Sequence, residues 1–188
     1  MNQDIKSLIG LTYEDENGKD YKIVGIKEVT EDYITLDIEE VKSETIGYKF
    51  GSRSLNNLKG VHPNMVRLMN ESIKDSPYDF TITEGLRTAK RQNELYQQGR
   101  TKPGIKVTSL DGYNKKSNHQ AKSDGYGYAV DLYPYINGSV RVEYERYKKE
   151  TNAIAEHILS TAKRLGIKIE WGGYWKSPFD PPHFELKK

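Results

Sequence analysis

The sequence contains no cysteine among its 188 residues. This absence excludes disulfide bonds, thiolate zinc sites and cysteine nucleophiles, so imidazole and carboxylate groups are left as ligands for any metal ion. The sequence also lacks a run of about 18 apolar residues, and its polar first residues do not resemble a signal peptide. We therefore expect a soluble protein that is made in the cytoplasm and does not insert into a membrane.

An excess of charge of either sign is missing as well. Lysine and arginine number 29 and aspartate and glutamate number 27, which gives a formal net charge of +2. A nucleic-acid partner calls for a concentrated basic face, and the interspersed charges here predict none. The mild positive charge is compatible with an anionic polymer as partner.

The N-terminal part of the chain reads as β structure. Short apolar stretches alternate with turn signals over residues 8–50, and the period-two alternation is most regular over residues 33–38. This pattern predicts half-buried antiparallel strands in a small all-β module, which we place at residues 1–55. The module holds no histidine, so binding, docking or covering the second part are its expected roles. Residues 52–61 read as the linker.

Residues 56–188 are predicted to form an α+β domain. Apolar residues at helical spacing predict three helices, at residues 63–76, 88–99 and 143–165. Thr88 is a candidate N-cap, and Gly99 and Gly166 are candidate stop signals. Short apolar runs predict strands at residues 80–85, 129–133 and 167–171. A long polar loop at residues 100–128 is typical of either a functional or a disordered segment.

Two of the four histidines and one aspartate suggest a metal site. His62 and His157 have an ordinary packing or surface interpretation, whereas His119 lies in the polar loop and His183 follows two prolines that restrict its backbone. Asp131 stands among apolar neighbours, where coordination to a cation would remove the cost of burying an unpaired carboxylate. Three such ligands are typical of a catalytic zinc site. Spacing alone leaves open that Asp131 forms an ordinary cap or ion pair and that both histidines are ordinary loop residues.

Hydrolysis at such a site also needs a base and an electrophilic partner. Asp180, three residues before His183, is the candidate base, and Glu185 and Glu170 are weaker candidates. Arg87, just beyond a predicted strand, is a candidate to stabilise an oxyanion. Its alternative interpretation is an ordinary surface arginine at a helix start.

Three ordered stretches of sequence make a family resemblance specific. They are GLRTAKRQNELYQQGRTKPG, then SNH followed by GYAVDL, and finally EWGGYWKSPFDPPHFEL. Together they resemble the zinc D-alanyl-D-alanine carboxypeptidase (VanY/VanX-like) superfamily, and most closely its L-alanyl-D-glutamate peptidase branch, which includes bacteriophage endolysins. The resemblance covers about residues 58–187 and leaves the N-terminal module outside.

The resemblance implies a fold, a cofactor and residue roles. The fold is a small antiparallel sheet flanked by helices, of the Hedgehog/DD-peptidase type. The cofactor is one zinc ion, and the implied ligands are His119, Asp131 and His183. The resemblance also makes Asp180 the catalytic base, Arg87 the residue that stabilises the transition state, and Ser117 a residue that positions substrate.

Two departures from the family pattern affect the cleft. Residues 120–126 separate His119 from Gly127 by five residues more than is usual, which we expect to reshape the rim without moving either ligand. Tyr174 stands where the branch often has aspartate, which bears on substrate preference. Lys115 and Lys116 are expected near the cleft, where positive charge suits an acidic peptide.

The function that follows is cleavage of the peptidoglycan stem peptide by a monomeric zinc peptidase, most closely an L-alanyl-D-glutamate endopeptidase. A D-alanyl-D-alanine carboxypeptidase with the same site is the alternative enzyme, and an inactive wall-binding or phage structural protein is the alternative from another class. Without a signal peptide, the expected route to the cell wall is release from the host cytoplasm during lysis, or transport on a phage particle.

Overall fold

The computed structural model describes residues 3–16, 20–30, 32–40 and 47–187. The chain divides into two compact units, residues 1–45 and residues 46–188. The division falls earlier than the boundary after residue 55 that the sequence suggested.

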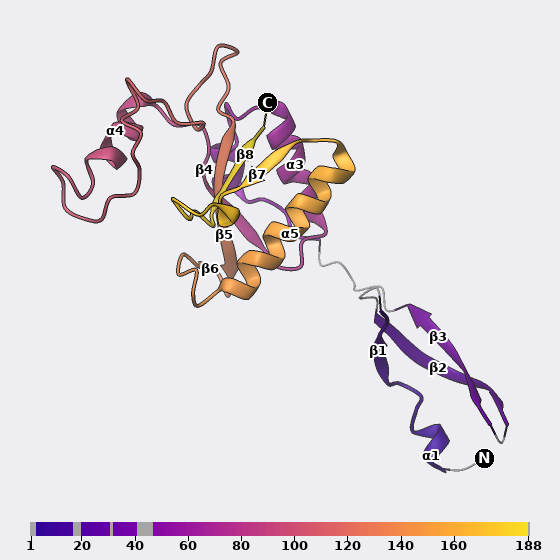
Figure 1. Cartoon of the computed structure of the whole chain (residues 1–188). Helices are drawn as coiled ribbons and strands as arrows, with labels where there is room; N and C mark the ends of the chain where they lie inside the picture. Colours follow the sequence, from indigo (N-terminus) through magenta and orange to yellow (C-terminus); the bar gives the residue numbers. More distant parts are fainter. Residues whose placement is uncertain (1–2, 17–19, 31, 41–46, 188) are drawn as a thin grey trace. The chain divides into compact units, whose positions relative to one another are not determined.

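The first unit is a three-stranded antiparallel sheet (Figure 1). Its order is β1 (Thr12–Glu14), β2 (Asp20–Val29), β3 (Ile34–Glu40). A one-turn helix that the sequence analysis does not predict, α1 (Gln3–Lys6), precedes the strands, so the unit is mostly rather than entirely β. Ile23 is buried in this unit, whereas Ile34 and Ile38 are 40% and 44% exposed.

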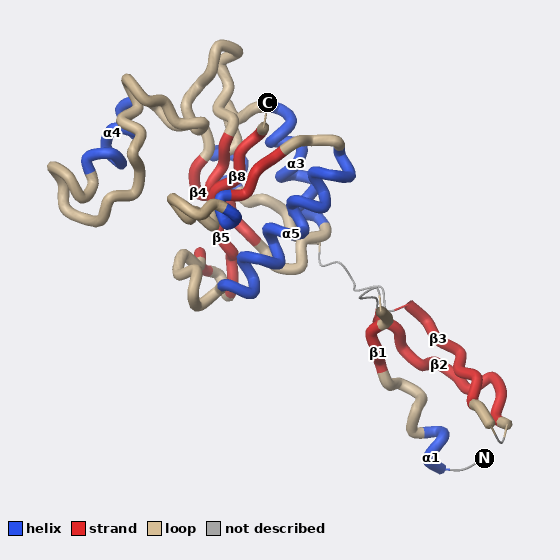
Figure 2. The backbone as a smooth tube through the Cα atoms, viewed as in Figure 1, coloured by secondary structure: helices blue, strands red, loops and turns tan. Residues whose placement is uncertain are grey.

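The second unit is built on one antiparallel sheet with the strand order β4-β5-β8-β7 (Figure 2). The strands are β4 (Phe80–Glu84), β5 (Ala129–Ile136), β8 (His183–Leu186) and β7 (Ile169–Trp171), and β6 (Ser139–Val140) pairs with the end of β5. Strands β4, β5 and β7 agree with the prediction, whereas β6 and β8 were not predicted. The order brings chain segments that are far apart in sequence side by side at β5.

The helices of the second unit are α2 (Ser52–Asn57), α3 (Pro63–Lys74), α4 (Ala89–Gln97) and α5 (Lys148–Leu165). The Thr88 hydroxyl accepts from the N–H of Arg91, which confirms the predicted cap of α4. Gly166 ends α5 with a φ of 68°, as predicted, but α5 begins later than the predicted residue 143. Among the described residues, no helix has both the length and the apolar character that crossing a membrane requires.

Apolar side chains of α3 and α5 form the core with the sheet. The two helices pack together, and α5 also contacts β5 and β7. The fully or almost fully buried residues at this contact are Met65, Leu68, Met69, Ile154, Ile158, Val130 and Phe184. The helical periodicity seen in the sequence is therefore the periodicity of this buried surface.

The prediction that residues 52–61 form a linker is wrong, because these residues belong to the second unit. The first part of this segment is α2, which packs against the edge strand β4. The Ser54 hydroxyl accepts the Ile82 N–H at 3.1 Å, and the Asn57 amide donates to the Ile82 carbonyl at 2.8 Å. Polar side chains here satisfy the exposed edge of a sheet, and this explains why so polar a segment belongs to the domain.

Candidate metal centre

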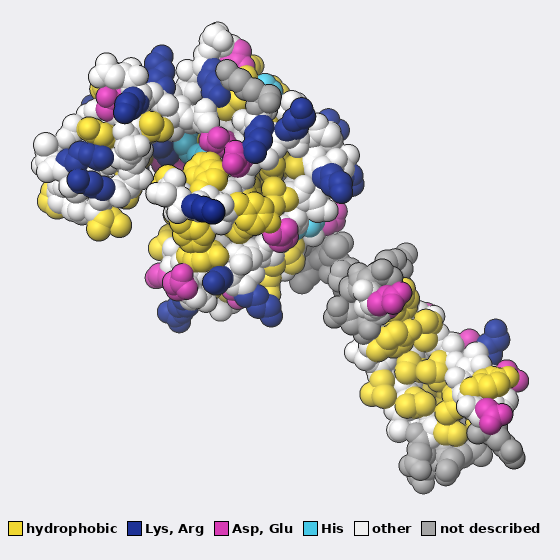
Figure 3. Space-filling model, in the orientation of Figure 1, with side chains coloured by type: hydrophobic (Ala, Val, Ile, Leu, Met, Phe, Trp, Pro, Cys, Tyr) yellow, Lys and Arg dark blue, Asp and Glu magenta, His cyan; other side chains and the backbone are white. Residues whose placement is uncertain are grey.

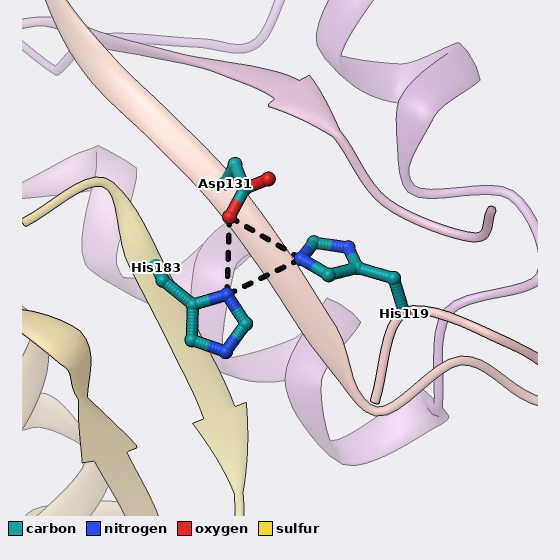
Figure 4. Close-up of side chains that lie close together, drawn as sticks. All are labelled: His119, Asp131 and His183. Carbon is teal, nitrogen blue, oxygen red and sulfur yellow. Dashed lines mark hydrogen bonds and ion pairs between the residues drawn. The ribbon is translucent and has the colours of Figure 1, made fainter. Parts of the chain in front are cut away.

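His119, Asp131 and His183 converge on one point (Figure 4). Nε2 of His119 lies 3.2 Å from Oδ1 of Asp131, and Nδ1 of His183 lies 3.1 Å from the same oxygen. The two ring nitrogens are 3.2 Å apart. One ligand atom from each residue therefore lies within 4.8 Å of the others, which is an arrangement that could hold a metal ion.

Strand pairing places two members of this cluster. Asp131 lies on β5 and His183 at the start of β8, and the two residues are direct partners in the antiparallel register. The neighbours of Asp131, Val130 and Leu132, point into the core from the other face of the strand. The apolar run around Asp131 therefore anchors the carboxylate at the sheet surface.

His119 comes from the long loop and is held by the segment that follows β4. Its Nδ1 lies 2.8 Å from the carbonyl oxygen of Gly85, which can only accept a hydrogen bond. Nδ1 therefore carries the proton, and the Nε2 lone pair faces Asp131. The His119 carbonyl accepts the Arg87 N–H at 2.9 Å, so the backbone of the loop is fixed as well.

His183 is oriented through its other nitrogen. Nε2 donates to Oε2 of Glu185 at 3.0 Å, and the same oxygen accepts from the Asn118 amide at 2.7 Å. The other ring nitrogen, Nδ1, is thereby directed at the cluster. A ligand histidine whose second nitrogen is held by a carboxylate is the usual arrangement in protein metal sites.

The electrostatics of the cluster favour positive charge. Burial alone raises the pKa of Asp131, but the adjacent His119 and His183 outweigh it, and the pKa lies well below its usual value. Burial alone lowers the pKa of His183, but Asp131 and Glu185 raise it to about 9. The carboxylates of Asp131 and Glu185 therefore favour positive charge on the neighbouring imidazole.

Residues 46–186, a stretch that includes the whole cluster, match the family model described as phage L-alanyl-D-glutamate peptidase. The chain belongs to this family.

Individual relatives agree with this assignment. Over 143 residues the chain is 30% identical to the L-alanyl-D-glutamate peptidase of Escherichia phage T5, a match that covers 76% of this chain and 92% of the phage protein. Over 111 residues it is 40% identical to the peptidoglycan L-alanyl-D-glutamate endopeptidase CwlK of Bacillus subtilis, covering 57% of this chain and 60% of CwlK. The chain thus spans less than two thirds of CwlK.

The fold is also similar to that of a solved structure. The crystal structure of the Serratia marcescens L-Ala D-Glu endopeptidase ChiX superposes with a TM-score of 0.57 at 32% identity, over 77% of this chain and 94% of ChiX. The mixed α+β architecture expected from the sequence is therefore confirmed at this level.

In this member of the phage L-alanyl-D-glutamate peptidase family, Arg87 is buried next to the candidate metal centre. Its Nη2 lies 3.1 Å from Oδ2 of Asp131 and 2.8 Å from Oε2 of Glu84, and its Nη1 donates to Oε1 of Gln92 at 2.7 Å. The interpretation as a surface arginine is wrong, because Arg87 is only 9% exposed. Its guanidinium holds the oxygen of Asp131 that does not face the imidazoles.

Asp180 lies in the turn that leads into β8. Its N–H donates to the Gly172 carbonyl at 3.0 Å, and its own carbonyl accepts the N–H of His183 at 3.1 Å. Burial is the main cause that raises the pKa of the Asp180 carboxyl, and the charge of Asp131 raises it further. His183, His119 and Arg87 act in the opposite direction, so the carboxyl lies within electrostatic reach of the whole cluster.

The other predicted residues take local roles. The Ser117 hydroxyl accepts a hydrogen bond from the N–H of His119 at 3.2 Å. This bond shapes the loop at residues 100–128 that carries His119, called the ligand loop below. A contact between Ser117 and substrate stays a prediction. Glu185 is bound to His183, and Glu170 forms an ion pair with Lys187 at 3.3 Å, so both of the weaker base candidates already have a partner.

Histidines outside the cluster are structural, as predicted. Nδ1 of His62 accepts the N–H of Asn64 at the start of α3, and Nε2 of His157 lies 3.0 Å from the Ser72 carbonyl. The cluster therefore uses the two histidines that the sequence analysis selected.

Gln92 is the supporting residue that the sequence analysis missed. It is fully buried, accepts from Arg87, and donates to the carbonyl of Leu110 at 2.8 Å and to the hydroxyl of Thr108 at 3.3 Å. One amide thus connects α4, Arg87 and the ligand loop. A glutamine in an otherwise polar helix shows none of this in the sequence.

Residues 121–126, which belong to the lengthened segment between His119 and Gly127, form a mostly exposed turn beside the site. The N–H of Lys122 donates to the Tyr126 carbonyl at 3.0 Å, and that of Gly127 donates to the Gly60 carbonyl at 2.9 Å. A Cβ atom on Gly127 would lie only 2.7 Å from the His119 carbonyl oxygen. The loop thus bulges while its two ends remain in contact, which agrees with the expectation.

Aromatic residues near the site divide into two groups. Trp171 belongs to the core, where its Nε1–H donates to the Pro181 carbonyl at 2.7 Å. Trp175 is half-buried, and its ring centroid lies 5.1 Å from that of His183. Trp175 therefore borders the metal centre.

Proposed function

We propose that this chain is a zinc-dependent peptidase that cleaves the bond between L-alanine and D-glutamate in the peptidoglycan stem peptide. The observation that carries the proposal is the convergence of His119, Asp131 and His183 within the part of the chain that matches the family. The similarity to the L-alanyl-D-glutamate peptidases of phage T5 and Bacillus subtilis supports the choice of bond. The Hedgehog/DD-peptidase type of fold is part of the same proposal.

The residues present fit a zinc ion. Two imidazole nitrogens and one carboxylate oxygen are typical zinc ligands, and three protein ligands leave a position open for chemistry. Both rings are oriented by hydrogen bonds from their second nitrogens, to Gly85 and to Glu185. When bound, zinc supplies Lewis acidity, which polarises a carbonyl group and makes water acidic enough to react near neutral pH.

Asp180 is the residue that moves the proton. Its carboxyl lies beside the cluster but is not one of the three converging groups, and its pKa is raised by burial. A carboxylate of raised pKa accepts a proton from the attacking water more readily and can deliver it to the leaving amine. Asp180 therefore acts as general base and then as general acid.

Arg87 serves two purposes in the proposed site. Its ion pair with Asp131 fixes the ligand carboxylate, and its positive charge next to the site favours the negative charge that develops on the carbonyl oxygen. Because Gln92 and Glu84 hold the guanidinium in place, this charge is oriented before substrate binds.

The biological setting completes the proposal. A monomeric enzyme is released from the host cytoplasm during lysis, or is carried on a phage particle, and acts at the cell wall. The role of residues 1–45 stays a prediction, with wall binding, docking and stabilisation of the catalytic unit as its alternatives. Wall binding is tested by measuring how much of the full chain binds to purified sacculi in the presence of chelator.

Mass spectrometry of sacculus digests tests the function. The wild type is expected to release fragments with a new amino terminus on D-glutamate, and the Asp180→Ala variant and a chelated sample are expected to release almost none. Release of free D-alanine would instead identify a D,D-carboxypeptidase. Intact walls after incubation with zinc-loaded wild type would favour the inactive binding protein.

A further inference from the structure

A cavity of about 360 Å³ lies beside the metal centre, on the side of Arg87. Its wall includes Arg87, Thr88 and Ala89 around the start of α4, and Tyr113, Lys116 and Gln120 of the ligand loop. Two of these residues connect it to the centre, because Arg87 contacts Asp131 and Gln120 follows His119. Figure 3 shows a hollow in the surface of the second unit in which histidine is visible.

Of the two cationic side chains on the cavity wall, Arg87 has carboxylate partners among the described residues and Lys116 does not. The guanidinium of Arg87 is already paired with Glu84 and Asp131. Lys116 is exposed and forms no ion pair with any residue in the described part of the chain. The Asp111 carboxylate, which precedes the cavity residue Gly112, accepts from the N–H groups of residues 113–115 and is thereby occupied. An uncompensated positive charge therefore faces the cavity.

The start of α4 adds to this potential. The helix has nine residues and begins at the cavity wall, with Thr88 as its cap. Its first N–H groups, at Ala89 and Lys90, have no acceptor among the residues that the structure describes. Free N–H groups and the helix dipole at an N-terminus both favour an anion. Arg87, nine-tenths buried in the same wall, has an Nε without a hydrogen-bond partner.

We propose that this cavity binds the free carboxylate of the glutamate residue next to the scissile bond. The inference rests on the proposed function. Glutamate has two carboxyl groups and only one of them continues the peptide, so the other is left free within one residue of the bond that is cut. The Lys116 ammonium pairs with this carboxylate, and the start of α4 supplies N–H donors. A neutral amide at the same position loses the charge interaction.

Two substrates that differ in one group test this subsite. Both are L-alanyl-D-glutamyl peptides. In one, the glutamate carboxyl group that does not continue the peptide is a free carboxylate, and in the other it is a carboxamide. Wild type is expected to show a KM roughly tenfold lower for the free acid, in line with a charge-assisted hydrogen bond. The Lys116→Met variant is expected to lose most of this preference with kcat nearly unchanged. Lys115→Met removes the neighbouring exposed charge, which does not line the cavity, and is expected to retain it.

Binding to the full-length protein gives a second readout that does not need turnover. The backbone N–H resonances of Ala89 and Lys116 are followed by NMR during two titrations. One uses the L-alanyl-D-glutamate dipeptide, and the other uses the dipeptide in which the carboxylate proposed to bind is replaced by a carboxamide. Shifts with the acid that are absent with the amide and lost in Lys116→Met support the subsite. Equal responses to acid and amide, or equal effects of Lys116→Met and Lys115→Met, overturn it. Failure to cleave either substrate overturns the proposed function, while the titration still decides the subsite.

Discussion

Glu185 and His183 form a hydrogen bond of 3.0 Å between Oε2 and Nε2. Because they are two residues apart on β8, their side chains share one face of the sheet. The same ring offers Nδ1 to Asp131 at 3.1 Å, so both nitrogens of His183 are engaged and its rotation is restricted. The strand itself therefore orients a ligand of the metal centre.

Replacing Glu185 by glutamine is expected to weaken zinc binding by roughly 10–100-fold, because the ring of His183 loses its charged acceptor. The measurement is competition with a chromogenic chelator. Glu170→Gln is the matched control, since Glu170 lies directly opposite Glu185 on β7 and pairs with Lys187 instead. Equal affinities for the two variants would contradict the proposed role.

Replacing Gln92 by leucine is expected to lower the free energy of unfolding by about 2–4 kcal/mol, because a buried Arg87 N–H and the Leu110 carbonyl both lose their partner. Urea denaturation followed by tryptophan fluorescence measures the loss. Lys90→Leu, at an exposed position of the same helix, should change the stability by less than about 0.5 kcal/mol. A Gln92 variant as stable as this control would show that the network contributes little.

Two glycines flank the turn beside His119 and allow a matched comparison. Gly127→Ala is expected to displace the His119 backbone and weaken zinc binding, because the new Cβ would lie 2.7 Å from its carbonyl oxygen. Gly125→Ala meets no atom within 4 Å, and its φ of 84° costs only about 1 kcal/mol of stability. Zinc affinity of both variants is the measurement. A Gly127 variant with unaltered affinity would mean that the loop adjusts without moving the ligand.

The pH dependence of stability is expected to include a contribution from His157. Burial is the main cause that lowers the pKa of this imidazole below 6.5, and its hydrogen bond to the Ser72 carbonyl only partly opposes it. Below pH 6.5 the unfolded chain therefore binds the proton more readily, so the free energy of unfolding falls as the pH drops through 6.5 towards the folded-state pKa.

His157→Gln should flatten this slope. Urea midpoints of wild type and variant, measured between pH 7.5 and 4.5 with chelator in both samples, give the difference. Parallel curves for the two proteins would assign the pH dependence to other groups.

Much of the second unit could be predicted from local patterns. The apolar spacing of α3 and α5 reflects the surface that each helix buries, and the cap at Thr88 acts on its own first turn. The absence of cysteine left histidine and carboxylate as ligands, and the ordered motifs indicated which ones. These features depend on residues close in sequence or on the residue types alone.

Other features depend on partners that are distant in sequence. Residues 52–57 read as a linker because their polar side chains bind the edge of β4, and neither the strand edge nor its unpaired groups can be seen in a six-residue pattern. Strand β8 is hidden in the same way, because it is short and follows two prolines.

The sequence by itself determined which residue types can bind a metal ion, because it contains four histidines and no cysteine. It also determined the helices whose apolar periodicity matches a buried face. Only the tertiary structure decided that Nε2 of His119 and Nδ1 of His183 face the same oxygen of Asp131, and that Glu185, Gln92 and Arg87 hold them there. The reason is physical: hydrogen-bond direction depends on strand register and loop path, which bring together atoms that no local pattern relates.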